Sequence, residues 1–439
     1  MTYTESIKYI ISTYGKGSKR GFDVLLSVLA ELGSPQKNLR CIHVAGTNGK
    51  GSACAMLSEI LKRAGYKTGM FTSPHLSRFN ERLQIDGKAV CDEKLASLCE
   101  RVKATTETVL GKDGKLSYFE LLTIMGFLYF YEEKVDLLVL EVGLGGRLDA
   151  TNVIENPLVS LIMSIGLDHM EQLGGEIGLI TVEKCGIIKK NCPTVLYFQP
   201  GEVYNVVKDV CGQKQSELYY PENFELSVEN AEKDVTGEVF SLTYTLRGEE
   251  TSFERVEIGL TGDCQPYNAA VVLLTVKAMR DAGIEIPEKA VAEGLLCAKW
   301  PGRVEVAGER PLVVLDGAHN LDGAQMLQKT IARRFGKKPT MLIGILKDKQ
   351  YPQMLAELCK NAGRIVLTRP LYGARAVKPA ELYNELVKLN LPGNIPVSVI
   401  EDCRKAFDAA KTVTPEDGTI IVCGSLYLVG DIRDHIRNI

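Results

Sequence analysis

The chain has no hydrophobic run long enough to cross a membrane. Its longest apolar stretch, from Leu121 to Tyr131, contains Thr123 and falls well short of the roughly 20 residues that a membrane-spanning helix needs. The N-terminal residues Met1 to Glu5 also lack a basic region followed by an apolar segment. We therefore expect a cytoplasmic protein without a signal peptide and without a membrane partner.

The chain also lacks an excess of charge of either sign. Its 52 lysines and arginines face 55 aspartates and glutamates, which gives a formal net charge of −3. A general nucleic-acid binder needs a strong positive field, so this balance argues against that class. With 45% hydrophobic and 24% charged residues, the composition is that of an ordinary globular protein. Its length of 439 residues predicts two to three domains of roughly 150 residues each.

Paired cysteine spacing is absent as well. The chain has 12 cysteines, but no two of them form the C-x-x-C pair that many zinc sites and redox motifs use. A disulfide framework is typical of short secreted chains. We therefore expect buried free thiols in a reducing compartment. Those that lie inside apolar helix or strand patterns are Cys41, Cys54, Cys99, Cys297, Cys359 and Cys423.

What the chain does have is an alternation of apolar strands and helices. The first half predicts strands at 41–45, 135–142 and 158–165. It also predicts one helix that ends at residue 64 and another that spans 118–131. Glycine-rich and polar motifs follow these strands directly. The alternation implies a parallel sheet, with ligands at the edge formed by the carboxyl ends of the strands.

The pattern changes after about residue 195. Alternating apolar residues at 240–246 and a second run at 251–260, joined by Arg247 and Gly248, predict an antiparallel hairpin attached to the first sheet. A helix is expected at 267–282.

A domain boundary is expected near residues 298–302, because the alternation restarts beyond it. We predict an α/β protein with two domains: residues 1–298, with a parallel sheet and a small β appendage, and residues 299–439, a smaller Rossmann-like α/β domain. A ligand cleft is expected between them. The strands of the second domain are predicted at 312–315, 340–345, 364–367, 397–400 and 419–422.

The strongest local signal is a glycine-rich turn between the strand at 41–45 and the next helix. Glycines let the backbone wrap a phosphate group, amides at a helix start favour an anion, and Lys50 adds a positive charge. The pattern departs from the strict phosphate-loop motif, because Val44 stands where the first glycine is expected and the hydroxyl comes one residue late. A plain glycine turn is the alternative. The loop comprises Gly46, Thr47, Asn48, Gly49, Lys50, Gly51 and Ser52.

Further polar side chains follow strands at the same edge. Glu141 ends an apolar strand and suits a magnesium ligand opposite a phosphate loop, with a solvated strand end as the alternative. His75, His169 and His319 all lie just after predicted strands. A single histidine is more often a core or surface residue, so each of them is weak evidence alone. The polar, glycine-rich loop at 143–152 allows close approach of the backbone to a substrate.

Taken together, these motifs resemble one family closely. They are similar to those of folylpolyglutamate synthase/dihydrofolate synthase, which belongs with the muramyl-peptide (Mur) ligases. The threonine–asparagine pair of the phosphate loop and the segment 145–152 favour the folate branch. The segments that carry the resemblance run in order along nearly the whole chain: 43–52, 72–76, 140–152, 168–169, 183–187, 301–303, 316–320 and 424–430.

The resemblance implies the nature of both domains and the reaction. Residues 1–298 are then a P-loop ATPase-like domain of the Mur ligase central type that binds ATP, and residues 299–439 are a glutamate ligase domain. The implied reaction is the ATP-dependent addition of L-glutamate to a folate, through an acyl phosphate. Dihydropteroate is a further acceptor that the sequence leaves open. We expect a monomer with small-molecule substrates and no nucleic-acid partner.

The resemblance also implies a site for ATP and two magnesium ions. Lys50, Lys184 and His319 are then catalytic, and the glycine-rich loop holds the phosphates. Lys184 is implied to carry a carbamate, with an unmodified surface lysine as the alternative. The implied magnesium ligands are Ser73, Glu141 and His169. The residues implied to contact ATP from across the cleft are Asn268, Arg303, Asp316 and His319.

The implied pterin pocket consists of Phe119, Leu148, Asp149 and Ala150. One departure from the family pattern is Cys264. Relatives usually carry histidine and glutamine before the asparagine that corresponds to Asn268, and here Cys264 and Gln265 stand there. Three alternatives to the folate ligase remain. These are a muramyl-type ligase, a phosphate-loop GTPase or motor ATPase, for which the Asn-Lys-x-Asp guanine signature is missing, and a non-catalytic nucleotide-binding protein.

Overall fold

Neighbouring side chains of the central strands pack into different hydrophobic cores. In β5 (Leu137–Glu141), Leu137 and Val139 belong to one core, while Leu138 and Leu140 belong to another on the opposite face. All four are buried, because helices cover both faces of the sheet. Parallel strands buried on both faces need continuous apolar runs. This requirement explains why the run folds as a central strand.

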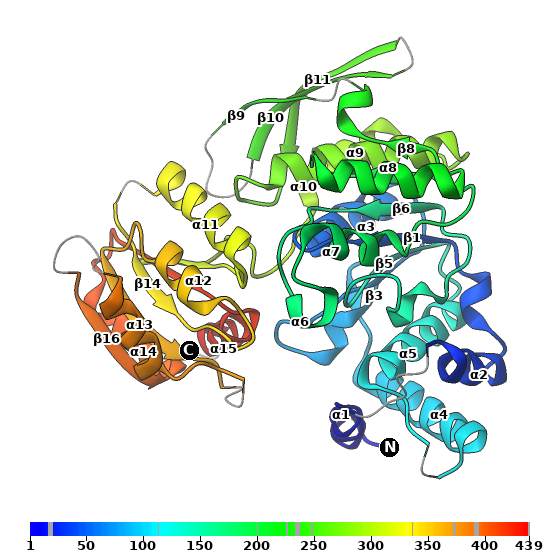
Figure 1. Cartoon of the computed structure of the whole chain (residues 1–439). Coiled ribbons are helices and arrows are strands. Elements are labelled where there is room, and N and C mark those ends of the chain that lie inside the picture. The colour runs from blue at the N-terminus through cyan, green and yellow to red at the C-terminus, as the bar shows by residue number, and fades with distance from the viewer. Residues whose placement is uncertain are drawn as a thin grey trace.

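The computed structural model describes residues 1–15, 21–112, 114–199, 201–224, 227–232, 238–246, 249–335, 337–371, 375–389 and 395–437. Within them, the first domain contains an eight-stranded sheet of order β4-β3-β2-β5-β1-β6-β7-β8 (Figure 1). Only β3 and β4, at one edge, run antiparallel to their neighbours. The other strands are β1 (Cys41–Ala45), β2 (Thr68–Phe71), β6 (Val159–Ile162), β7 (Thr194–Leu196) and β8 (Leu218–Tyr219), and the edge strands are β3 (Leu83–Ile85) and β4 (Lys88–Ala89).

Two groups of helices enclose this sheet. Helices α3, α9 and α10 pack on one face, and α1, α2, α4, α5, α7 and α8 pack on the other. Helix α5 is apolar on nearly all sides, as expected of a helix buried between a sheet and other helices. The bounds are α1 (Tyr3–Ser12), α2 (Asp23–Glu31), α3 (Lys50–Arg63), α4 (Asp92–Leu110), α5 (Tyr118–Glu132), α6 (Met170–Leu173), α7 (Ile177–Cys185), α8 (Glu202–Lys214), α9 (Gln265–Asp281) and α10 (Glu288–Cys297).

The antiparallel strands predicted after residue 195 form a sheet of their own. Strands β9 (Ser227–Glu232), β10 (Glu238–Leu246) and β11 (Glu249–Ile258) pair in the order β11-β10-β9, at the top of Figure 1. The predicted hairpin corresponds to β10 and β11, and β9 escaped prediction. The appendage joins the first domain through Val256 and Ile258, which are buried in the core beside α3 and α9. The predicted turn at 247–248 lies outside the described residues.

The second domain contains a six-stranded sheet of order β12-β13-β17-β14-β15-β16, on the left of Figure 1. Strand β12 is antiparallel to β13, and the other strands are parallel. The bounds are β12 (Glu305–Glu309), β13 (Leu312–Leu315), β14 (Thr340–Ile343), β15 (Arg364–Arg369), β16 (Val397–Asp402), β17 (Thr419–Cys423), α11 (Leu321–Arg334), α12 (Tyr351–Leu358), α13 (Pro379–Lys388), α14 (Cys403–Val413) and α15 (Leu426–Arg437).

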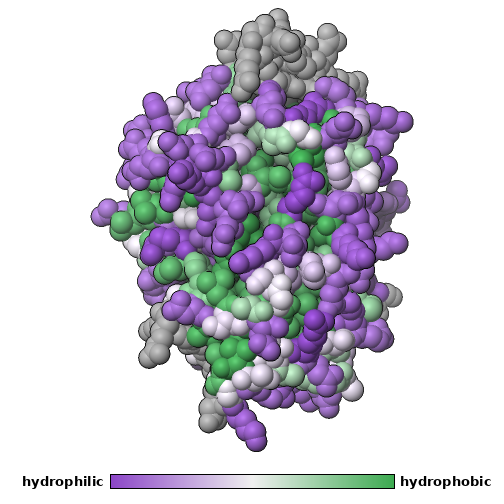
Figure 2. Space-filling model, turned by 90° about the vertical axis from the view of Figure 1, so that its right-hand side faces the viewer, coloured by the Kyte–Doolittle hydropathy of each residue, from purple (hydrophilic) through white to green (hydrophobic). Residues whose placement is uncertain are grey.

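The surface is mixed rather than uniformly apolar. On the face shown in Figure 2, hydrophobic residues form small groups separated by hydrophilic ones. Among the described residues, no helix is both long enough and apolar enough to span a bilayer.

All 12 cysteines are free, and nine of them are buried. Cys91 and Cys297 are exposed, and Cys264 is intermediate. The expectation that Cys297 is buried is therefore wrong. Cys297 is the last residue of α10, where the side chain turns away from the core.

This distribution predicts the thiol reactivity of the native protein. An aromatic disulfide reagent should modify Cys91 and Cys297 rapidly and Cys264 slowly, because burial denies the reagent access to the other thiols and raises the pKa of several of them. All 12 thiols should react in denaturant. Rapid modification of four or more thiols in the folded protein would contradict this packing, and peptide mapping identifies which cysteines reacted.

Candidate active site

The glycine-rich loop connects β1 to α3 at the carboxyl edge of the first sheet. Gly49 has a φ of +85°, and a Cβ there would lie 2.8 Å from Oδ1 of Asn268. Glycine is therefore required both by the backbone conformation and by the close approach of α9. Nζ of Lys50 donates to the carbonyl oxygens of Gly46 at 3.0 Å and Thr47 at 3.2 Å. The lysine ammonium thus lies inside the curve of its own loop.

The single tryptophan of the chain packs against the start of α3. A Cβ at Gly51 would lie 2.5 Å from Nε1 of Trp300, so only glycine fits at this position. Trp300 belongs to the segment that leads from α10 into the second domain. The phosphate loop and the interdomain segment are therefore in direct contact.

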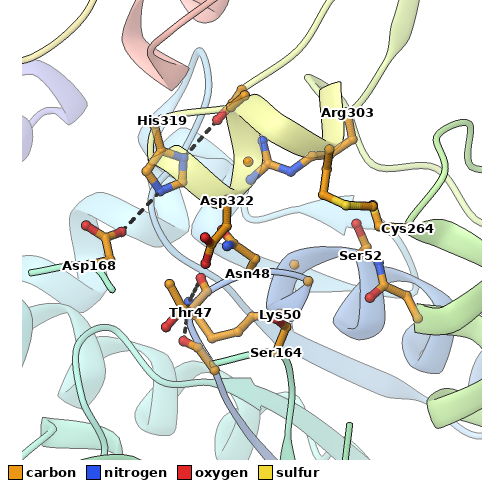
Figure 3. Close-up of a pocket in the computed structure, with 18 of the residues that line it drawn as sticks. Thr47, Asn48, Lys50, Ser52, Ser164, Asp168, Cys264, Arg303, His319 and Asp322 are labelled. Carbon is orange, nitrogen blue, oxygen red and sulfur yellow. Dashed lines mark hydrogen bonds and ion pairs between the residues drawn. The ribbon is translucent and has the colours of Figure 1, made fainter. Parts of the chain in front are cut away.

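A cavity of about 470 Å³ opens above this loop, between the two domains (Figure 3). Every residue predicted for the nucleotide and metal sites lines it. These residues are Gly46, Thr47, Asn48, Gly49, Lys50, Gly51, Ser52, Ser73, Glu141, His169, Lys184, Asn268, Arg303, Asp316 and His319.

One of these residues reaches the cavity from an unexpected side. Asn268 lies on α9 of the first domain, so the expected side of its approach is wrong, while its contact with ATP stays a prediction. Its Nδ2 donates to Oε1 of Gln265 at 3.0 Å, and its Oδ1 faces Gly49. Arg303, Asp316 and His319 do lie beyond α10, on the side of the second domain.

Glu141 is buried at the end of β5, directly beside the phosphate loop. Its Oε2 accepts a hydrogen bond of 2.9 Å from the backbone amide of Ser73. Burial raises the pKa of this carboxyl, and the ammonium of Lys50 acts against that shift. The alternative of a solvated strand end is wrong, because only 3% of Glu141 is exposed.

The donor set around Glu141 fits magnesium better than a tightly caged metal. Among the described residues, no group of three or more histidine, cysteine, aspartate or glutamate side chains is arranged to hold a metal. Magnesium is usually bound through one or two carboxylates together with substrate phosphates and water. Glu141, Ser73 and His169 line the same cavity as the phosphate loop, so they suit that mode.

Lys184 is buried, and its ammonium points at the phosphate loop. Nζ donates to the carbonyl oxygen of Gly46 at 2.8 Å, and only 3% of the residue is exposed. The alternative of a surface lysine is therefore wrong. Burial, together with the nearby charge of Lys50, lowers the pKa of Lys184 to about 7. A substantial fraction of this amine is therefore neutral at physiological pH.

The second domain contributes a turn organised by Asp316. Its carboxylate accepts hydrogen bonds from the backbone amides of Val304 at 3.0 Å and Ala318 at 2.9 Å. Nδ1 of His319 lies 2.8 Å from the carbonyl oxygen of Gly317, which can only accept, so Nδ1 carries the proton. Burial and the charge of Lys349 lower the pKa of His319 to about 4. The imidazole is therefore neutral near pH 7.

A second cavity, of about 750 Å³, adjoins the first. Phe119, Leu148, Asp149 and Ala150, the residues predicted for the pterin pocket, all line it. The two cavities share Ser73, Pro74, Gly143, Leu144, His169, Leu173, His319 and Leu426. Molecules bound in the two cavities would therefore meet at this shared wall.

Asp149 is held by its own loop and by a buried chain of hydrogen bonds. The carboxylate accepts from the backbone amide of Leu144 at 2.8 Å and from the hydroxyl of Thr151 at 2.6 Å. Nε2 of His43 lies 2.8 Å from the same hydroxyl. Because that hydroxyl donates to Asp149, His43 must be the donor in this contact. These contacts fix Asp149 at the wall of the second cavity.

Comparison with known proteins identifies the family. The Mur ligase middle domain model matches residues 44–276, and the model of the dihydrofolate synthetase C-terminal domain matches residues 304–436. A dihydrofolate synthase/folylpolyglutamate synthase of Bacillus subtilis is 35% identical, with 99% of both chains covered. The chain belongs to the folylpolyglutamate synthase/dihydrofolate synthase family.

Other relatives cover equally much of the chain. A folylpolyglutamate synthase of Lacticaseibacillus casei is 33% identical over 99% of this chain and 98% of its own. The solved structure of Mycobacterium tuberculosis folylpolyglutamate synthase complexed with ADP has a TM-score of 0.89 and 29% identity, covering 99% of this chain and 98% of that one. This family of ATP-dependent glutamate ligases is the class that the sequence motifs indicate, and membership decides against a GTPase.

The departure from the family pattern at Cys264 leaves a thiol at the wall of the first cavity. Figure 3 shows Cys264 beside Arg303 and Ser52. Burial raises the pKa of this thiol to about 11, so it stays protonated. The side chain therefore brings no charge to the site of this folylpolyglutamate synthase relative.

Asp168, Lys349 and Asn320 escaped prediction as site residues of this family member. Nζ of Lys349 lies 2.6 Å from Oδ1 of Asp168, and Nδ2 of Asn320 lies 3.3 Å from Oδ2. Burial raises the pKa of Asp168, but Lys349 and the neighbouring histidines outweigh it and hold the pKa well below its usual range. The sequence feature that could have indicated Lys349 is the charged turn at 347–349, which follows the strand predicted at 340–345.

The contact between Trp300 and Gly51 predicts an optical signal for nucleotide binding. Adding ATP with magnesium should change the fluorescence of Trp300 in a saturable way, because phosphates bound by the loop lie next to the indole. Trp300→Phe should remove the signal, since the chain has one tryptophan. Unchanged fluorescence in a sample whose ATP binding is proven by calorimetry would contradict this placement.

Proposed function

We propose that this chain is a folylpolyglutamate synthase that joins L-glutamate to a folate at the expense of ATP. The observation that carries the proposal is the shared wall of the two cavities. A phosphate loop lines one cavity, and Phe119 with the loop 143–150 lines the other. A carboxylate held in the second cavity would therefore meet the terminal phosphate of a nucleotide held in the first.

The reaction follows from this juxtaposition. The folate carboxylate attacks the γ-phosphorus of ATP, which forms an acyl phosphate and releases ADP. The amine of glutamate then attacks the acyl carbon, phosphate leaves, and the amide forms with loss of the amine proton. Phosphoryl transfer depends mostly on positioning and charge neutralisation. Lys50 and Arg303 supply positive charge at the wall of the first cavity.

Magnesium would be held by Ser73, Glu141 and His169 together with the nucleotide phosphates, and we propose two ions. When bound, it neutralises phosphate charge. Ser73 already orients Glu141 through its backbone amide. Neutral His319 at the shared wall can accept a proton at Nε2, because Nδ1 is committed to Gly317.

Lys184 is the residue that we propose to be carbamylated. An ammonium next to Lys50 and metal ions would be repelled, whereas a carbamate offers anionic oxygens. Carbamylation needs a neutral amine, and the lowered pKa of Lys184 provides one. The second cavity, lined by Phe119, Leu148, Asp149 and Ala150, is the proposed site for the pteridine ring.

The boundary between the two domains is proposed at residues 298 and 299. This point lies between the end of α10 at Cys297 and the start of β12 at Glu305. The monomeric state and the cytoplasmic location stay predictions from the sequence.

The proposed activity can be tested with purified protein, ATP, magnesium and glutamate. Tetrahydrofolate should support both ADP release and amide formation, and dihydropteroate, compared in parallel, reports whether the chain is bifunctional. Lys50→Ala should lower turnover by roughly 100-fold or more, because charge stabilisation of the transferred group is lost. Lys62→Ala, on the exposed side of the same helix, is the matched control. Without amide formation from any pteridine acceptor, the proposal fails.

The carbamate on Lys184 has a spectroscopic test. With ¹³C-labelled CO₂ at fixed pressure, a carbamate carbon signal should grow as the pH rises through about 7, because the neutral amine is the reacting form. Lys184→Ala should lose the signal and nearly all turnover, and short carboxylates should restore part of the turnover. Lys190→Ala, an exposed lysine nearby, is the control. An unmodified, dispensable Lys184 would refute this role.

A further inference from the structure

Lys349 belongs to the second domain, but its ammonium is buried against the first. Nζ lies 2.6 Å from Oδ1 of Asp168 and 3.5 Å from Nε2 of His169. Each of the paired side chains, Lys349 and Asp168, is only 7% exposed. His169 lines both cavities, so this interdomain ion pair lies beside the place where the two cavities meet.

The backbone around Lys349 fixes this lysine to the body of the second domain. Its amide donates to the carbonyl oxygen of Leu346 at 3.3 Å. Leu346 forms a β-bridge with Ala376, and the amide of Lys347 donates to the carbonyl oxygen of Arg375 at 2.8 Å. The distance from Lys349 to Asp168 therefore depends on how the two domains sit against each other.

A second contact links the same carboxylate to the phosphate loop. Oδ2 of Asp168 lies 3.3 Å from Nδ2 of Asn320, the residue that caps α11 by accepting from the amide of Gly323 at 2.8 Å. The side-chain amides of Asn320 and Asn48 also bond to each other, at 3.0 and 3.4 Å. Asp168 thus joins the body of the second domain to the loop that would hold the phosphates.

A buried ion pair of this kind selects one arrangement of the two domains more than it stabilises the folded protein. Desolvating two charges costs nearly as much as their attraction returns, so a buried pair adds little net stability. If the domains shift slightly while the site stays dry, Asp168 and Lys349 each face a poor environment alone. The pair therefore penalises partly closed arrangements.

We propose that Lys349 is a positioning residue, which sets the closed arrangement of the two domains through Asp168 and so keeps water from the acyl phosphate. The role rests on the proposed function, because that intermediate is what needs protection. When the domains are misplaced, water replaces the glutamate amine as nucleophile. The folate carboxylate then returns and phosphate leaves, so ATP is consumed without an amide.

The test compares Lys349→Met and Lys349→Arg with the wild type and with a control, Lys347→Met. Lys347 is exposed in the same turn. Three quantities are measured: the rate of amide formation, the ratio of phosphate released to amide formed, and the radius of gyration by small-angle X-ray scattering with ADP and magnesium. Circular dichroism establishes that each variant is folded.

For Lys349→Met we expect amide formation to fall by roughly 10- to 100-fold, the size of effect that slight misplacement of reacting groups produces. The phosphate-to-amide ratio should rise well above that of the wild type, and the radius of gyration should increase. Lys349→Arg keeps the charge and should stay near the wild type in both the ratio and the radius. Lys347→Met should match the wild type throughout.

Two results would overturn the proposal. In the first, Lys349→Met behaves like Lys347→Met in all three measurements. In the second, amide formation falls while the ratio and the radius stay unchanged, which would make Lys349 a substrate contact instead. Failure of the proposed function is recognised separately, because then the wild type itself forms no amide while the scattering comparison remains valid.

Discussion

The carbonyl oxygen of Gly46 accepts hydrogen bonds from two lysine ammonium groups, those of Lys50 and Lys184. Two amines at one acceptor make this point strongly electropositive, and burial removes the water that would screen them. Such a point is stabilised when an anion binds, when one amine loses its proton, or when one becomes an anionic carbamate. Burial lowers the pKa of Lys184 most, and the nearby charge of Lys50 lowers it further. The geometry of the loop therefore favours a bound anion, a neutral amine or a carbamate at this point.

The sequence predicts most of the fold because the strands of a parallel sheet are buried on both faces. The continuous apolar runs at β1, β5 and β13 therefore stand out, and each ends in a polar motif at the carboxyl edge. Strand β12 gives no such signal. It is an antiparallel edge strand whose residues are all at least partly exposed, and it includes Gly308. Its place depends on pairing with β13, which no local pattern encodes.

Some residues of the candidate site can be predicted from local sequence patterns, and others depend on contacts between distant parts of the chain. Residues of the phosphate loop and Glu141 are found from the sequence because each follows a strand directly, and topology alone brings such residues together. Asp149 was predicted to line the pocket, but the hydrogen-bond chain that holds it could not be seen, because His43, which contacts Thr151, lies on a strand more than 100 residues earlier. Lys349 was missed for a related reason. Its partner lies on another domain, and one charged turn on the surface looks like any other.

The two-domain architecture follows from the chemistry that the site has to perform. An acyl phosphate must stay away from water, yet ATP, a folate and glutamate must all enter. A cleft between two domains that opens for entry and closes for reaction would satisfy both needs. Closing two domains reproducibly requires contacts that form in only one relative position of the domains. The amide pair Asn48–Asn320 and the ion pair Lys349–Asp168 have this property. A displacement of about one ångström breaks a hydrogen bond or separates a buried ion pair, whereas apolar surfaces tolerate such a shift better. Polar contacts at the domain interface therefore define the reactive geometry, while the hydrophobic cores within each domain supply the stability.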